Sequence, residues 1–152
     1  MGESAALQRL RELCAQMPPV AALRVEVAGF DGESLELRAP LAANVNDKGN
    51  AFGGSLVSLM TLAGWGLVNL QLQLRGIAAE VYVADSQVRY RAPLYDDLRA
   101  TAWPGEGESW QTFFDTLARR GRARLQVEAA VPLAGGGVAT EMSGRFVAIA
   151  KG

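Results

Sequence analysis

The segment NVNDKGNAFGGSL, residues 44–56, lies immediately before the most apolar part of the chain. It places three glycines among polar side chains, a composition that is typical of a turn-rich loop. Residues 51–74 then carry no charged side chain, as expected of a helix that is buried on most of its surface. The segment therefore predicts a glycine-rich turn that leads directly into a central helix.

The apolar stretch 51–74 has two interpretations. Its length alone would allow it to cross a membrane. Its uncharged polar side chains argue against that, as do flanks that alternate like the strands of a soluble domain. These side chains are Ser55, Ser58, Thr61, Asn69, Gln71 and Gln73. We therefore expect no membrane association, and a sheet that wraps the helix where Ala63, Gly64 and Gly66 allow close approach.

The remaining segments predict one further helix before the central one and strands on both sides of it. Leucines at three- and four-residue spacings predict a helix over 4–17, capped by Ser4 and ended by Pro18–Pro19. Alternation around Phe30-Asp31-Gly32 predicts a hairpin. The predicted strands are 23–29, 33–40, 80–92, 98–103, 122–132 and 137–150, with a short helix between Ser109 and Gly121. This order favours an α+β fold in which an antiparallel sheet wraps one apolar helix.

Composition limits the function classes. The 152 residues fit one domain, 1–152, and the net charge of −1 provides no long-range field that would attract nucleic acid. The chain has no histidine, which excludes Ser-His-Asp and Cys-His catalysis and His-rich zinc sites; we expect no metal and no cofactor. With one cysteine, Cys14, and no signal-peptide pattern at its start, the chain is expected to be cytoplasmic.

Two motifs carry a resemblance to a known superfamily. The segment N46-D47-K48-G49-N50-A51-F52-G53-G54 precedes the wrapped helix, and Y90-R91-A92-P93 ends the strand that follows it. Together they resemble a hot-dog-fold thioesterase, a superfamily in which one recurrent pattern reads Asn-x-x-Gly-x-x-His-Gly-Gly and a later strand ends in Tyr/Phe-x-x-Pro. The resemblance covers nearly the whole chain and implies the hot-dog fold.

More narrowly, these motifs and the RRGRARLQVEA segment look like the thioesterase domain that some bacteria fuse C-terminally to a GNAT-type acetyltransferase. Two positions depart from the superfamily. Phe52 stands where better-known acyl-CoA thioesterases carry histidine. Thr61 stands where they place the catalytic carboxylate of the central helix. The usual assignment of catalytic residues therefore does not transfer to this chain.

The glycines at the helix start are the first candidate for catalysis. Gly53 and Gly54 would present backbone N–H groups at a helix N-terminus, where they could hold the oxyanion of a thioester under attack. Their alternative role is close packing of the turn against a strand. Asn46 could orient water or the thioester, or it could form a local Asx-turn.

Water activation requires a base, for which the candidates are Asp47 in the loop and Asp85 on the following strand, with Ser86 as a hydrogen-bond partner. Strict alternation puts Ser86, together with Tyr82, Ala84 and other even-numbered residues, on the face toward the helix, and turns Asp85 away. A bulge or a subunit interface would be needed to bring Asp85 to the site. Otherwise Asp85 is a surface residue paired with Arg89 or Arg91.

Substrate contacts are predicted around the helix start and at a cluster of arginines. Near the helix the predicted contacts are Phe52, Ser55, Thr61 and Tyr90. Four arginines surround Gly121, and of these Arg120 and Arg122 are the predicted contacts for CoA phosphates. The alternative is a solvated helix end whose cations complement the helix dipole.

Two functions follow as hypotheses. One is a thioesterase that cleaves an acyl-CoA or acyl-carrier-protein thioester by attack of water. The other is a non-catalytic module that binds acyl thioesters and has lost the base, which the substitutions at Phe52 and Thr61 favour. Hot-dog domains pair across a two-fold axis, and the long edge of the strand over 80–92 would be an aggregation hazard if left open. We therefore expect a homodimer or homotetramer.

Overall fold

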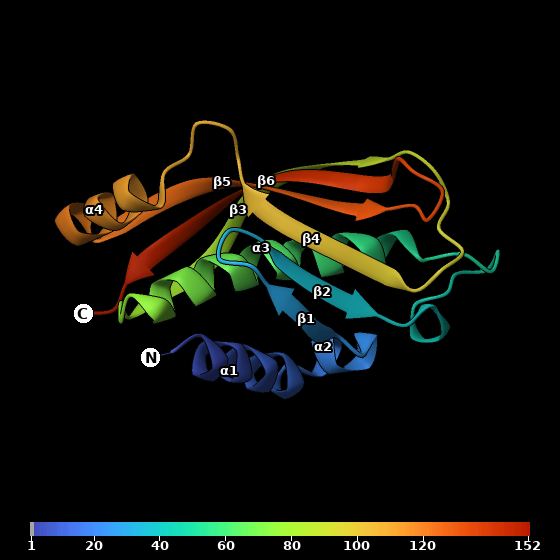
Figure 1. The fold of residues 1–152 in the computed structure, drawn as a ribbon, viewed down its shortest axis with the longest axis horizontal. Coiled ribbons are helices and arrows are strands. Elements are labelled where there is room, and N and C mark those ends of the chain that lie inside the picture. Colours follow the sequence, from blue (N-terminus) through green and yellow to red (C-terminus); the bar gives the residue numbers. More distant parts are fainter. Residues whose placement is uncertain (1) are drawn as a thin grey trace.

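The structure, a computed structural model, describes residues 2–152, which form one sheet around a long helix (Figure 1). Its helices are α1 (Glu3–Gln16), α2 (Pro18–Leu23), the 3-10 turn η1 (Leu41–Ala43), α3 (Gly53–Leu74) and α4 (Trp110–Arg120). Its strands are β1 (Glu26–Phe30), β2 (Leu35–Ala39), β3 (Ala79–Tyr90), β4 (Leu98–Pro104), β5 (Arg122–Pro132) and β6 (Val138–Ala150). The predicted α+β fold class is confirmed.

The sheet has the order β1-β2-β4-β5-β6-β3, and every neighbouring pair is antiparallel. It curls around α3, while α1 lies beside α3 on the side away from the upper strands (Figure 1). The inner face of the sheet is apolar because alternate residues of each strand point toward α3. β1 and β3 form the two edges of the sheet.

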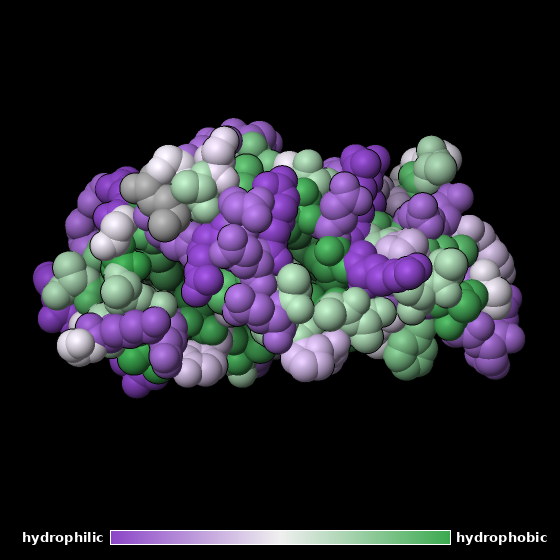
Figure 2. Space-filling model, turned by 90° about the horizontal axis from the view of Figure 1, so that it is seen from below, coloured by the Kyte–Doolittle hydropathy of each residue, from purple (hydrophilic) through white to green (hydrophobic). Residues whose placement is uncertain are grey.

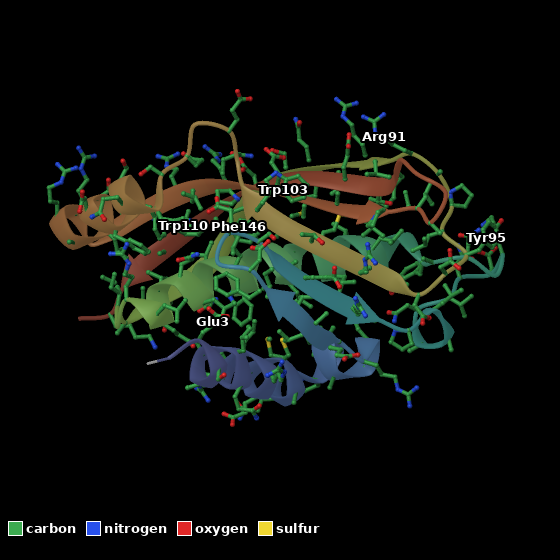
Figure 3. The ribbon with its side chains drawn as sticks, viewed as in Figure 1. Glu3, Arg91, Tyr95, Trp103, Trp110 and Phe146 are labelled. Carbon is green, nitrogen blue, oxygen red and sulfur yellow. The ribbon has the colours of Figure 1, made fainter. Side chains whose placement is uncertain are left out.

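The central helix is apolar because the sheet and α1 cover most of it. Phe146 of β6 lies against α3, and its ring would stand 2.6 Å from a Cβ added at Gly64 (Figure 3). At Gly66 an added Cβ would stand 2.8 Å from the side chain of Leu35. The predicted close approach at these two glycines is confirmed. α3 is the one helix in the described residues that is long and apolar enough to cross a membrane, but 61% of its most apolar window is buried by the protein.

The N-terminal region differs from the prediction in two ways. Helix α1 begins after Gly2 with no side-chain cap, so Ser4 lies inside the helix. Pro18 and Pro19 do not end helical structure, since they occupy the first turn of α2, where a missing N–H has no cost. As a result residues 23–25 end a helix rather than begin a strand, and β1 starts at Glu26. The polar face of α1 forms a hydrophilic patch on that side of the surface (Figure 2).

Helix α4 has the ends that the sequence predicts. The Ser109 side chain accepts a hydrogen bond from the N–H of Thr112, and Gly121 ends the helix in the left-handed conformation with φ of 74°. Its aromatic residues face the core, where Arg75 lies 4.6 Å from the centre of the Phe114 ring. Since Arg75 directly follows α3, α4 packs at the C-terminal end of the central helix.

Candidate functional site

The loop that leads into α3 is held by its own asparagines. Val45 and Ala51 form an antiparallel bridge, and the N–H of Asn46 donates to the carbonyl of Asn50 (2.8 Å). The Asn46 Oδ1 accepts from the N–H groups of Lys48 (2.8 Å) and Asn50 (3.2 Å), while its Nδ2 donates to Asn50 Oδ1 (2.7 Å). Asn46 thus forms the Asx-turn that was one of its two predicted roles, and only one Nδ2 hydrogen is left for another partner.

A second asparagine, Asn44, fastens this loop to the body of the protein. Its side chain is 3% exposed and donates to the carbonyls of Leu23 (2.9 Å) and Pro40 (2.8 Å). Its own carbonyl accepts from the N–H of Phe52 (2.8 Å), and the N–H of Ala51 donates to Leu94 (2.8 Å). Asn44 was not among the predicted site residues, because nothing in the spacing distinguishes a buried anchor from the other polar residues of the loop.

The N-terminus of α3 presents unused hydrogen-bond donors. Phe52 is the N-cap residue, and its side chain makes no capping bond. The first helical bond runs from Leu56 N–H to the carbonyl of Phe52 (3.1 Å). Within residues 2–152 no acceptor engages the N–H groups of Gly53, Gly54 or Ser55. Such groups, with the helix dipole behind them, favour an anion or a developing oxyanion.

Two exposed aromatic rings flank these donors. The ring of Phe52 is so close to Gly54 that a Cβ there would stand 2.5 Å from it, whereas a Cβ at Gly53 would meet the Tyr90 ring at 3.4 Å. The hydroxyl of Tyr90 donates a long hydrogen bond, 3.4 Å, to the carbonyl of Gly53. Phe52 is 55% and Tyr90 59% exposed, so both rings are accessible, while Ser55 is buried.

Strand β3 contains a bulge that changes which residues face α3. The register with β6 shifts between Val83 and Asp85, leaving Ala84 unpaired. Beyond the bulge, Ser86 lies opposite Gly144 on the inner face, as predicted. Before it, Tyr82 pairs with the outward-facing Val147, so the prediction that Tyr82 faces the helix is wrong. Strict alternation failed because the bulge adds one residue to the strand.

Asp85 lies on the outer face of the sheet, although the strand does contain a bulge. Both of its oxygens accept hydrogen bonds from the Arg145 guanidinium, Oδ1 from Nε at 2.9 Å. This partner is neither of the predicted ones, Arg89 or Arg91, and Arg91 instead pairs with Glu141. The hydrogen bond from Arg145 holds the pKa of Asp85 below its usual value. The Asp85 carboxylate is therefore ionised, but both of its oxygens are occupied by Arg145.

The other candidate carboxylate, Asp47, is at the tip of the loop before α3. Its side chain is 79% exposed and forms an ion pair with the neighbouring Lys48 (3.0 Å). Such an exposed pair holds its members only weakly. The side chain of Asp47 is therefore not held in one position by a buried partner, although it lies on the loop that leads into the helix N-terminus.

The inner face of the sheet has hydroxyl groups but no acid. Thr61 is half-buried, and its Oγ1 donates to the sulfur of Met142 at 3.7 Å. Met142 lies on the inner face of β6 beside Gly144, which is opposite Ser86. Thr61 and Ser86 therefore lie on facing surfaces. Throughout residues 2–152, neither α3 nor the strand residues that point toward it include Asp or Glu.

The predicted arginine contacts lie at the far end of the central helix. Arg120 and Arg122 line a pocket between α4 and the sheet, which none of the residues around Gly53 share. A helix of 22 residues such as α3 is about 33 Å long, and α4 packs at its C-terminal end. Within one protomer the structure therefore does not bring these arginines together with the helix N-terminus.

Comparison with known proteins supports the resemblance noted in the sequence. A family model described as "Putative thioesterase (yiiD_Cterm)" matches residues 6–150. A protein of unknown function from Chlorobaculum tepidum is 30% identical, with 98% of this chain and 94% of that chain covered and a TM-score of 0.87. A putative thioesterase from Shewanella oneidensis is 27% identical, with 96% and 99% covered and a TM-score of 0.84. A Haemophilus influenzae thioesterase, 18% identical over 95% and 90% of the two chains with a TM-score of 0.68, shares the fold.

Proposed function

This chain belongs to the yiiD_Cterm family of putative thioesterases, and we propose that it hydrolyses an acyl-CoA or acyl-carrier-protein thioester by attack of water. The observation that carries the proposal is the set of free N–H groups at Gly53, Gly54 and Ser55. A thioester carbonyl bound there gains negative charge as water attacks, and the donors stabilise that charge. Losing one such donor typically raises the barrier by about 2.7–4 kcal/mol.

Water activation is assigned to Asp47. A general base must be ionised and within hydrogen-bond reach of the attacking water. Asp47 is on the loop that leads into the donors, and its exposed pair with Lys48 leaves it free to turn toward a substrate. Asp85, by contrast, points away from α3 and is held by Arg145. The rings of Phe52 and Tyr90 would flank the thioester, while Ser86 and Thr61 supply the polar groups nearest the acyl side.

We also propose that a second protomer completes the site. Strand β3 leaves one edge unpaired over 12 residues, with Val83 43% exposed on the inner face beside α3. The four best-defined pockets in the described residues, of about 640, 450, 410 and 160 Å³, are not lined by residues of the helix N-terminus. A homodimer that pairs β3 with its copy would cover this edge and enclose the acyl group.

One observation favours a second candidate function. The residues that face α3 include no carboxylate. If neither Asp47 nor an acid of a second protomer activates water, the site could bind a thioester without cleaving it. Such a protein would be a binding module for acyl thioesters. The donors at Gly53 and Gly54 would still orient the carbonyl, so turnover rather than affinity separates the two functions.

The test is release of free thiol from a panel of acyl-CoA and acyl-pantetheine thioesters. We expect turnover by the wild type. Asp47→Asn should lower kcat by about 100-fold or more, because a general base typically contributes at least that factor to the rate. Lys48→Gln is the matched control, because it removes the ion pair and keeps the carboxylate; we expect it and Asp85→Asn to stay within threefold.

Equal rates for the wild type and Asp47→Asn would refute the assignment of the base. Saturable binding with no turnover of any thioester would refute hydrolysis and support the binding module.

A further inference from the structure

The largest of the four pockets lies on the outer face of the sheet, away from the proposed thioester site. It has a volume of about 640 Å³ and is bounded by α4 on one side and by β5 and β6 on the other. A volume of this size falls within the range of small-molecule sites. Its wall also includes the hydroxyl-bearing Thr112 and Thr116 of α4 and the apolar Val147 of β6.

Four arginines line this pocket against a single carboxylate, Glu108. They are Arg120, Arg122, Arg124 and Arg145. Arg145 is paired with Asp85, and Glu108 accepts a hydrogen bond from the backbone N–H of Gln126. In the part of the chain that the structure describes, none of the other three arginines forms an ion pair. Arg124 also lies near enough to Asp85 to interact with it, so the four arginines set against Glu108 and Asp85 leave the pocket with an excess of two positive charges.

The fold creates this cluster from local sequence. Arg120 ends α4, Gly121 turns the chain, and alternation along β5 then directs both Arg122 and Arg124 to the outer face. Arg119, next to Arg120 on the same helix end, does not line the pocket. A solvated helix end would explain Arg119 and Arg120 through the helix dipole, but it would not explain guanidinium groups on the outer face of two strands.

We propose that this pocket binds an organic phosphate, such as a nucleotide that carries two phosphate groups. Forked guanidinium groups match phosphate oxygens in pairs, and like charges gathered in one pocket repel one another until an anion neutralises them. A concave site suits a small ligand better than the convex acidic helix of a carrier protein. The inference goes beyond the proposed hydrolysis, because the pocket is separate from the donors at the start of α3.

Two sources would supply this chemistry, namely the nucleotide end of a CoA thioester and a free nucleotide. Both would present phosphate to the three unpaired arginines and a ring to the wall formed by Thr112, Thr116 and Val147. They differ in whether the ligand competes with a CoA substrate.

The test is calorimetric titration with adenosine 3′,5′-bisphosphate at low ionic strength, where charge pairing is least screened. We expect Arg122→Gln and Arg124→Gln each to weaken binding about tenfold, since charge-assisted bonds to phosphate contribute strongly. Arg119→Gln is the matched control and should stay within twofold of the wild type. Adenosine without phosphate should not bind detectably. Thermal melts of each variant show whether it is folded.

Competition assays then identify the source. If Arg124→Gln raises KM for acyl-CoA and leaves KM for acyl-pantetheine unchanged, the bound phosphate belongs to CoA. If the bisphosphate binds without competing with acyl-CoA, the natural ligand is a free nucleotide. Both results support the site. The proposal is overturned if the wild type does not bind the bisphosphate, or if Arg122→Gln and Arg124→Gln bind it as tightly as the wild type. It is also overturned if these arginines bind only an acidic carrier protein. Because the titration needs no turnover, a protein without thioesterase activity still tests it.

Discussion

The two neighbouring glycines at the start of α3, Gly53 and Gly54, differ in how much space a side chain would have. At Gly54 an added Cβ would stand 2.5 Å from the Phe52 ring, and at Gly53 it would make an ordinary 3.4 Å contact with Tyr90. The Phe52 ring lies across Gly54, at the position where the superfamily pattern quoted above has a histidine. The two glycines therefore offer a matched pair of substitutions.

We expect Gly54→Ala to displace the Phe52 ring and to lower kcat/KM for a thioester by about tenfold, or about 1.4 kcal/mol of barrier. Its free energy of unfolding should change by less than about 1 kcal/mol, since the displaced ring is exposed and alanine favours a helix more than glycine does. Gly53→Ala should change kcat/KM by less than threefold. Steady-state kinetics and urea unfolding test both variants, and similar kinetic losses in the two would contradict the role assigned to Phe52.

The direction of individual side chains on β3 could be predicted only in part from the sequence. Alternation correctly turned Asp85 outward and Ser86 inward, because both lie on the same side of the bulge. It failed for Tyr82, which lies on the other side of Ala84. The partner of Asp85 is Arg145, 60 residues away, and no local pattern indicates which strand will lie beside β3.

Among the elements, the strands and the central helix follow closely from periodicity. Apolar alternation located β2, β4, β5 and β6 to within about two residues, and the run without charges located α3. The N-terminal helices were less predictable, because Pro18–Pro19 can either stop a helix or begin one. That choice depends on how α2 packs, which the local sequence does not contain.

The exposed edge of β3 leads to a prediction about assembly. If β3 pairs with its copy, a lysine that replaces Val83 on the inner face beside the seam should weaken the dimer, because burying an unpaired charge is unfavourable. We expect sedimentation velocity to give a dimer for the wild type and a protomer fraction that rises at least tenfold for Val83→Lys. Glu33→Lys, an exposed change in the turn between β1 and β2 and therefore outside β3, is the control. A wild-type monomer at micromolar concentration would contradict the proposed assembly.

In the whole molecule, the two ends of α3 have separate tasks. Its N-terminus presents free donors between two aromatic rings, and its C-terminus packs against α4, beside which an arginine-lined pocket opens. Substrate contacts were predicted around the helix start and, with a solvated helix end as the alternative, at Arg120 and Arg122, but the sequence does not show how far apart the two groups lie. Their separation follows from the length of α3 and from the packing of α4 against Arg75 at its C-terminal end, a contact that the local sequence does not indicate.

The central claim is that the N–H groups of Gly53, Gly54 and Ser55 hold a thioester carbonyl. The most direct measurement is a ¹H–¹⁵N NMR titration of the wild type with an acyl-CoA analogue in which a methylene group replaces the sulfur, so that the ketone cannot be hydrolysed. The account predicts that the amide protons of these three residues move downfield on binding, whether or not the protein is an efficient enzyme. If the analogue binds and these three resonances stay in place while others move, the carbonyl is bound elsewhere and the account is wrong.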